Sequence, residues 1–61
     1  MNTLIAAEKC TKGSMVVYKN GLYEVKGIYQ HDKTKVLLEH QAWYLPDELV
    51  EKSTELVQVI W

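Results

Sequence analysis

Hydrophobic and polar residues alternate along much of the chain in short runs, a pattern typical of β-strands with one buried and one exposed face. The clearest pair of runs covers residues 15–19 and 22–26, which are rich in β-branched and aromatic side chains and flank Asn20-Gly21. Asn-Gly is a preferred centre for a type I′ turn, because both central residues of that turn need a positive φ. The pattern therefore predicts a β-hairpin over residues 15–26.

Further apolar runs continue this strand pattern beyond the hairpin. Gly27 falls inside the second strand, where a glycine usually marks a bulge or a bend, and the strand is expected to continue through residues 28–30. Turn-forming polar residues separate the remaining predicted strands, which cover residues 35–39, 43–45 and 55–61.

The ends of the pattern define the rest of the fold. Pro46 has no amide hydrogen to donate, so regular pairing is expected to stop there, and residues 46–49 are predicted to form a one-turn 3-10 segment. Residues 4–7 are predicted to form an edge strand beside the C-terminal one. Together these elements predict an all-β fold of five or six short antiparallel strands.

The alternation along each strand assigns side chains to two faces. Five residues are predicted to point into the core: Val16, Val25, Ile28, Val36 and Leu38. Four apolar residues are predicted to lie on the outer side: Met15, Val17, Tyr29 and Leu37. Two interpretations of these four remain open. Either the terminal strands cover them, or they form a contiguous exposed patch that binds a partner or a second copy of the chain.

The aromatic residues near the C-terminal half supply a second candidate surface. Trp43 and Tyr44 are neighbours on a predicted strand, so their side chains should face opposite ways and one of them should be exposed. An exposed aromatic residue beside a loop is a candidate hot spot for protein binding. Trp61 is expected to act as a core plug or as a dimer contact.

Length and composition indicate one small intracellular domain. The chain has 61 residues, of which 48% are hydrophobic, which favours a single globular unit near the lower size limit for independent folding. Its one cysteine, Cys10, cannot form an internal disulfide and fits a reducing compartment. The first residues do not resemble a signal peptide, and no apolar run approaches the length of a membrane span. A cytoplasmic location without membrane association is therefore expected.

Charge is distributed unevenly around a formal net value of −1. Residues 1–38 carry six lysines and three acidic residues, whereas residues 39–61 carry one lysine and five acidic residues. A uniformly basic nucleic-acid-binding protein would look different.

A nucleic-acid-binding face is nevertheless an alternative. Its basic residues would be four lysines of the first two hairpins, accompanied by Tyr29: Lys19, Lys26, Lys33 and Lys35. Glu24 and Asp32 lie in the same region, and the chain contains no arginine, the usual reader of phosphate and guanine. A solvated charged face is the simpler interpretation.

Catalytic, cofactor and metal chemistry find little support in the sequence. His31, His40 and Cys10 form the only conceivable metal-binding set, and their spacing matches no zinc motif. The chain has no glycine-rich phosphate loop and no nucleophile with an evident neighbouring base. We therefore expect no enzymatic activity, no cofactor and no metal.

Three short glycine-led patterns resemble the opening of SH3-like, Tudor and KOW-type barrels: Gly13-x-x-Val16-x-Tyr18, Gly21-x-Tyr23-x-Val25 and Gly27-Ile28. Residues 44–50 are similar to the closing element of Src-homology-3 domains, an apolar-Pro-x-x-Tyr-Val stretch. The resemblance covers residues 13–50 and implies a small SH3-like barrel. It implies little about function, because this barrel hosts many unrelated activities.

The residues that recognise polyproline in Src-homology-3 domains are not matched. Leu49 stands where the tyrosine of the closing motif would be, and Trp43 falls too late in the chain for the ligand-binding tryptophan. Recognition of a proline-rich peptide is therefore not expected.

The leading hypothesis from the sequence is a stand-alone protein-binding module. It would act through the outer apolar patch and through Trp43 and Tyr44, and the acidic stretch of residues 47–55 would steer a basic partner. Free-standing mini-barrels of this kind resemble small accessory proteins of phages and mobile elements. The alternatives are the nucleic-acid-binding barrel and a homo-oligomer whose shared groove forms the site.

Overall fold

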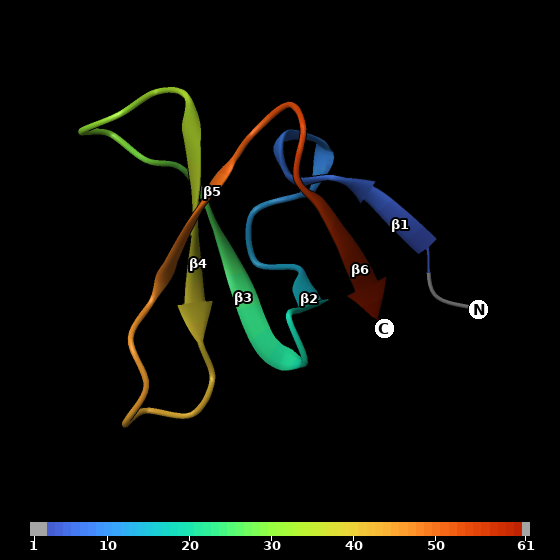
Figure 1. Cartoon of the computed structure of the whole chain (residues 1–61), viewed down its shortest axis with the longest axis vertical. Helices are drawn as coiled ribbons and strands as arrows, with labels where there is room; N and C mark the ends of the chain where they lie inside the picture. The colour runs from blue at the N-terminus through green and yellow to red at the C-terminus, as the bar shows by residue number, and fades with distance from the viewer. Residues whose placement is uncertain (1–2, 61) are drawn as a thin grey trace.

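The computed structural model describes residues 3–60, which form one antiparallel sheet and a single turn of 3-10 helix (Figure 1). The elements in chain order are β1 (Thr3–Ala6), η1 (Ala7–Lys9), β2 (Met15–Tyr18), β3 (Gly21–Ile28), β4 (Lys35–His40), β5 (Glu48–Glu51) and β6 (Leu56–Ile60). The strand order across the sheet is β1-β6-β2-β3-β4-β5. The all-β prediction is confirmed, with six strands.

The β2–β3 hairpin is confirmed, but its turn lies one residue earlier than predicted. Tyr18 pairs with Gly21, so the central turn residues are Lys19 and Asn20, with φ values of 49° and 65°. Gly21 belongs to the strand because it pairs with Tyr18. A Cβ at Gly21 would lie 2.8 Å from Cε1 of Tyr23, so a larger residue there would require the Tyr23 ring to shift. Glycine therefore suits this position for the space it leaves to Tyr23.

Gly27 marks a bulge, as predicted. The pairing of β3 with β4 shifts register between Val25 and Gly27, and Gly27 has a φ of 99°. Such a conformation is strained for residues with a side chain. The bulge bends β3 as the sheet curls.

One face of the curled sheet encloses the core. Its buried residues come from η1 and from every strand except β1: Ala7, Val16, Tyr18, Tyr23, Val25, Val36, Leu38, Val50, Val57 and Val59. Four of the five predicted core residues are among them. Ile28 is not, because it is the last residue of β3, beyond the bulge, where it is 46% exposed and lines an open hollow.

The N-terminal strand pairs with the C-terminal strand, as predicted, and β6 in turn pairs with β2. The 3-10 turn η1 follows β1 directly. The amides of Ala7 and Glu8 donate to the carbonyl oxygens of Glu55 and Lys52, both at 2.9 Å. These bonds tie η1 to the β5–β6 connection, although no ladder joins β1 to β5 within residues 3–60.

The segment around Pro46 differs from the prediction. Residues 43–45 form part of a turn and not a strand, and the fourth strand of the hairpin series is β5, which begins at Glu48. The 3-10 helix of this fold is η1, and residues 46–49 instead lead into β5. The chain leaves the sheet after His40 and pairs again where Glu48 meets Leu38, and Pro46, which has no amide hydrogen to donate, lies within this unpaired stretch.

Candidate functional site

The loop between β4 and β5 carries the most exposed aromatic side chains of the described structure. Trp43 is 92% exposed and Tyr44 is 71% exposed, and Leu45 beside them is also exposed. The strand predicted over residues 43–45 would point the two aromatic side chains to opposite faces and expose one of them. In a turn this constraint disappears, and both project into solvent.

Backbone hydrogen bonds hold this loop in place. The amide of Gln41 donates to the carbonyl oxygen of Leu22 on β3, at 2.9 Å, and the amide of Leu45 donates to the carbonyl oxygen of Ala42, also at 2.9 Å. The second bond closes a turn over residues 42–45, which we call the aromatic turn. Trp43 and Tyr44 occupy its two central positions, with ring centroids 5.8 Å apart in an edge-to-face arrangement.

His40 supports the base of the aromatic turn. Its Nδ1 accepts a hydrogen bond from the amide of Ala42, at 2.9 Å, so Nδ1 is the unprotonated ring nitrogen. The same ring packs edge-to-face on Tyr23, with centroids 4.5 Å apart. A core aromatic residue and a loop amide therefore hold the His40 ring between them.

A hollow of about 340 Å³ lies beside the aromatic turn, and we call it the acidic groove. It is lined by Glu39, His40, Gln41, Trp43, Leu45 and Asp47. Glu48 follows immediately in the chain and contributes negative charge nearby. Burial, followed by the charges of Glu48 and Tyr18, raises the pKa of Tyr23, which packs beside His40, whereas Lys19 lowers it. The groove lining itself carries two carboxylates, those of Glu39 and Asp47.

The four outer apolar residues do not form one continuous patch. Met15 and Val17 lie on β2, where Val17 pairs with Leu22, while Leu37 lies on β4 opposite Gly27. All four are partly buried.

Charged residues separate the two parts of this face. Glu24 pairs with Met15 on one side and with Glu39 on the other, so acidic residues stand between β2 and Leu37. The amine of Lys26 lies 3.6 Å from Oε2 of Glu24 and 3.4 Å from Oε1 of Glu39. These two carboxylates raise the pKa of Lys26. We call the three residues the Lys26 cluster.

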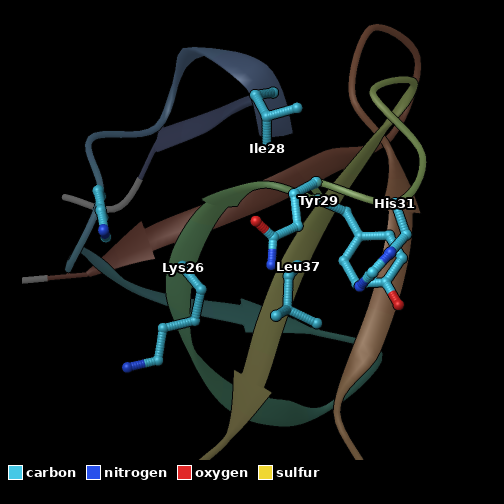
Figure 2. A pocket seen from close by; sticks show the side chains of 7 residues that line it. Lys26, Ile28, Tyr29, His31 and Leu37 are labelled. Carbon is cyan, nitrogen blue, oxygen red and sulfur yellow. The ribbon is translucent and has the colours of Figure 1, made fainter.

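Tyr29 and Leu37 instead line a second, open hollow of about 470 Å³ at the other end of the sheet (Figure 2). The rings of Tyr29 and His31 lie together there, with centroids 5.2 Å apart, and Lys26 extends away from them (Figure 2). The β3–β4 loop that carries Tyr29 and the β4–β5 loop that carries Trp43 lie at opposite ends of the molecule (Figure 1). The structure thus divides the predicted protein-binding residues among three places.

The four lysines of the alternative nucleic-acid face are also dispersed. Lys26 belongs to the Lys26 cluster, and Lys35 forms an ion pair with Glu51. Lys19 lies in the β2–β3 turn with its amine 5.3 Å from the Tyr18 ring centroid, whereas Lys33 lies in the β3–β4 loop. The amines of Lys19 and Lys33, which form no ion pair within residues 3–60, are therefore at different ends of β3.

The residues considered for metal binding do not converge. His31 and His40 lie at opposite ends of β4. Burial raises the pKa of the Cys10 thiol, whose Sγ contacts the carbonyl oxygen of Ala6 at 3.8 Å. Within residues 3–60, no three His, Cys, Asp or Glu side chains are close enough together to hold a metal ion. Trp61, proposed from the sequence as a core plug or dimer contact, lies outside the described residues.

Sequence reasoning named Trp43 and Tyr44, and it included Asp47 in an acidic stretch expected to steer a basic partner. It considered His40 only for metal binding and did not assign Glu39, Gln41 or Leu45 to a site. No local signal identifies these residues, because the groove forms only where the end of β4 lies near the residues before β5.

The part of the chain that the structure describes contains no helix with the length and apolar character needed to cross a membrane. Comparison with known proteins found no matching family model, no matching curated protein and no matching solved structure.

Proposed function

We propose that this chain is a non-catalytic protein-binding module that contacts its partner through the aromatic turn. The observation that carries the proposal is the exposure of Trp43 and Tyr44 at the tip of a turn whose backbone is hydrogen-bonded. Tryptophan and tyrosine are the residues most enriched among interface hot spots. A turn that is already ordered loses little conformational entropy on binding, which favours affinity.

The charge beside the turn indicates the kind of partner. Two carboxylates, those of Glu39 and Asp47, line the groove beside the aromatic turn, and Glu48 follows Asp47 in the chain. Complementary charge accelerates association and excludes wrong partners. The preferred partner surface is therefore basic, with an apolar pocket that receives Trp43.

We further propose that the curled sheet is an SH3-like barrel. Three features support this: the tight β2–β3 hairpin, the long β3 bent at Gly27, and a core drawn from one face of the sheet. The terminal strand β1 would be an addition beside β6.

Nucleic-acid binding is the weaker alternative. Lys26 and Lys35 already face carboxylates, so phosphate binding would have to displace those partners. A role of this kind would show as affinity that falls steeply with salt.

The test compares Trp43→Ala with wild-type protein and with Leu56→Ala, which removes another exposed apolar side chain, on β6. Because Trp43 is almost fully exposed, Trp43→Ala should change the free energy of unfolding by about 0.5 kcal/mol or less. The affinity for captured partner proteins should fall about 30-fold, as for a hot spot worth about 2 kcal/mol. Leu56→Ala should retain that affinity.

Two results would contradict the proposal. One is a Trp43→Ala variant that captures the same proteins with unchanged affinity. The other is a Trp43→Ala variant that unfolds, because it would show that the side chain serves the fold.

A further inference from the structure

The acidic groove presents a set of groups suited to one kind of side chain. We propose that it receives an arginine side chain of the partner protein, with the guanidinium between Asp47 and Glu39 and beside the Trp43 ring. This inference rests on the proposed protein-binding function and names the chemistry of the partner at the same site.

The lining of the acidic groove is suited to a cation. Two carboxylates line the groove, one from the end of β4 and one from the residue before β5, and no lysine lines it. Glu39 has a partner in Lys26, whereas Asp47 forms no ion pair within residues 3–60. A cation in the groove would supply Asp47 with the partner it lacks.

The shape of the acceptors favours guanidinium over ammonium. Gln41 donates through Nε2 to the carbonyl oxygen of Glu39, at 3.3 Å, which leaves its Oε1 as an acceptor. The groove thus combines a carboxylate at Asp47 with further oxygens and an aromatic ring. Arginine is planar, donates several hydrogen bonds in a fixed fork, and stacks on aromatic rings, whereas lysine offers a compact charge.

The proposed occupant is a partner of different sequence. The 61 residues contain seven lysines and no arginine, so a second copy of this segment does not supply the guanidinium. The same fact separates this inference from self-association through the outer face.

The experiment titrates 15N-labelled protein with N-acetyl-arginine amide, N-acetyl-lysine amide and N-acetyl-citrulline amide, and follows the amides and the Trp43 indole by NMR. Citrulline matches arginine in shape but carries no charge. The arginine amide should produce saturable shifts at Gln41, Trp43 and Asp47. Its affinity should exceed that of the citrulline amide about tenfold, because the bonds to carboxylate are charge-assisted.

Variants locate the binding. Asp47→Asn should weaken binding of the arginine amide about tenfold. Glu51→Gln, which removes a carboxylate that is paired with Lys35 on β5, should leave the affinity unchanged. Equal shifts with arginine and citrulline, preference for lysine, or unchanged binding by Asp47→Asn would each overturn the inference.

The two proposals can fail separately. If Trp43→Ala loses its protein partners but the arginine amide produces no shifts, the protein-binding function stands and the arginine inference falls. If the arginine amide binds while Trp43→Ala keeps every partner, the groove chemistry stands and the protein-binding role of the aromatic turn falls.

Discussion

Lys26 shows how single residues organise the outer face of this small sheet. Its amine lies near two carboxylates on neighbouring strands, Glu24 and Glu39, and these paired acidic residues separate the apolar residues of β2 from Leu37 on β4. Alternation along the strands places all of these side chains on one face, but only the pairing of three strands shows that the charges stand between the apolar residues.

The pKa of Lys26 supplies a residue-scale prediction. Glu24 and then Glu39 raise this pKa, so the charged amine is favoured in the folded state. The resulting contribution to stability is fully present below the pKa of an unfolded lysine and is lost as the pH rises through the higher pKa of the folded state. This loss of stability is therefore expected at alkaline pH.

Glu24→Gln should lower the pKa of Lys26, as measured by NMR titration of its side-chain Cε and Nζ signals. The matched control is Glu51→Gln, which removes the partner of Lys35 and should leave Lys26 unaffected. An unchanged titration of Lys26 in Glu24→Gln would mean that the carboxylate does not stabilise the amine in solution.

At the scale of elements, the aromatic turn depends on the end of β4. The His40 ring connects the two. Its Nδ1 accepts a hydrogen bond from the Ala42 amide, and the ring packs in an edge-to-face arrangement with Tyr23. The turn is therefore an extension of the β3–β4 ladder and not an independent loop. This connection explains how a short segment can hold two large aromatic side chains away from the core.

His40→Ala should loosen the aromatic turn. It removes the acceptor for the Ala42 amide, which should cost about 1 kcal/mol and speed the hydrogen exchange of that amide about fivefold. Gln41→Ala is the control, because it removes only an exposed side-chain bond to the Glu39 carbonyl. Equal exchange rates at Ala42 in wild-type and His40→Ala protein would show that the imidazole does not hold the turn.

At the scale of the whole molecule, stability depends on a small set of buried side chains. The sheet order brings β6 between β1 and β2, so residues from both halves of the sequence meet in one core. The single core of a domain of this size supplies a free energy of unfolding of at most about 3–5 kcal/mol. Each buried side chain is therefore a large fraction of the total.

Leu38→Ala should come close to unfolding the protein. Leu38 is completely buried, and its truncation should cost about 2–5 kcal/mol in urea denaturation. Leu49→Ala, on the neighbouring strand β5, removes a side chain that is 44% exposed and should cost about 0.5 kcal/mol. Similar losses from the two variants would mean that the core does not lie on the face assigned to it.

Local patterns predicted most of the elements correctly. The hairpin, the bulge at Gly27, the strand through Val36 and Leu38, and the pairing of the two terminal strands are all confirmed. Each depends on backbone preferences or on alternation between neighbouring residues. The candidate site was predicted less completely, because Trp43 and Tyr44 were named but placed on a strand.

The remaining features were decided by contacts between segments that are distant in the sequence. The pairing of Tyr18 with Gly21 assigns this glycine to the strand, and the return of the chain at Glu48 leaves the aromatic residues in a turn. The acidic groove likewise joins the end of β4 to the residues before β5. The sequence alone determined the fold class and the position of most strands, because these follow from local conformational preference and side-chain period. Only the tertiary structure decided which side chains gather at one site, because that depends on how strands pair across the sheet.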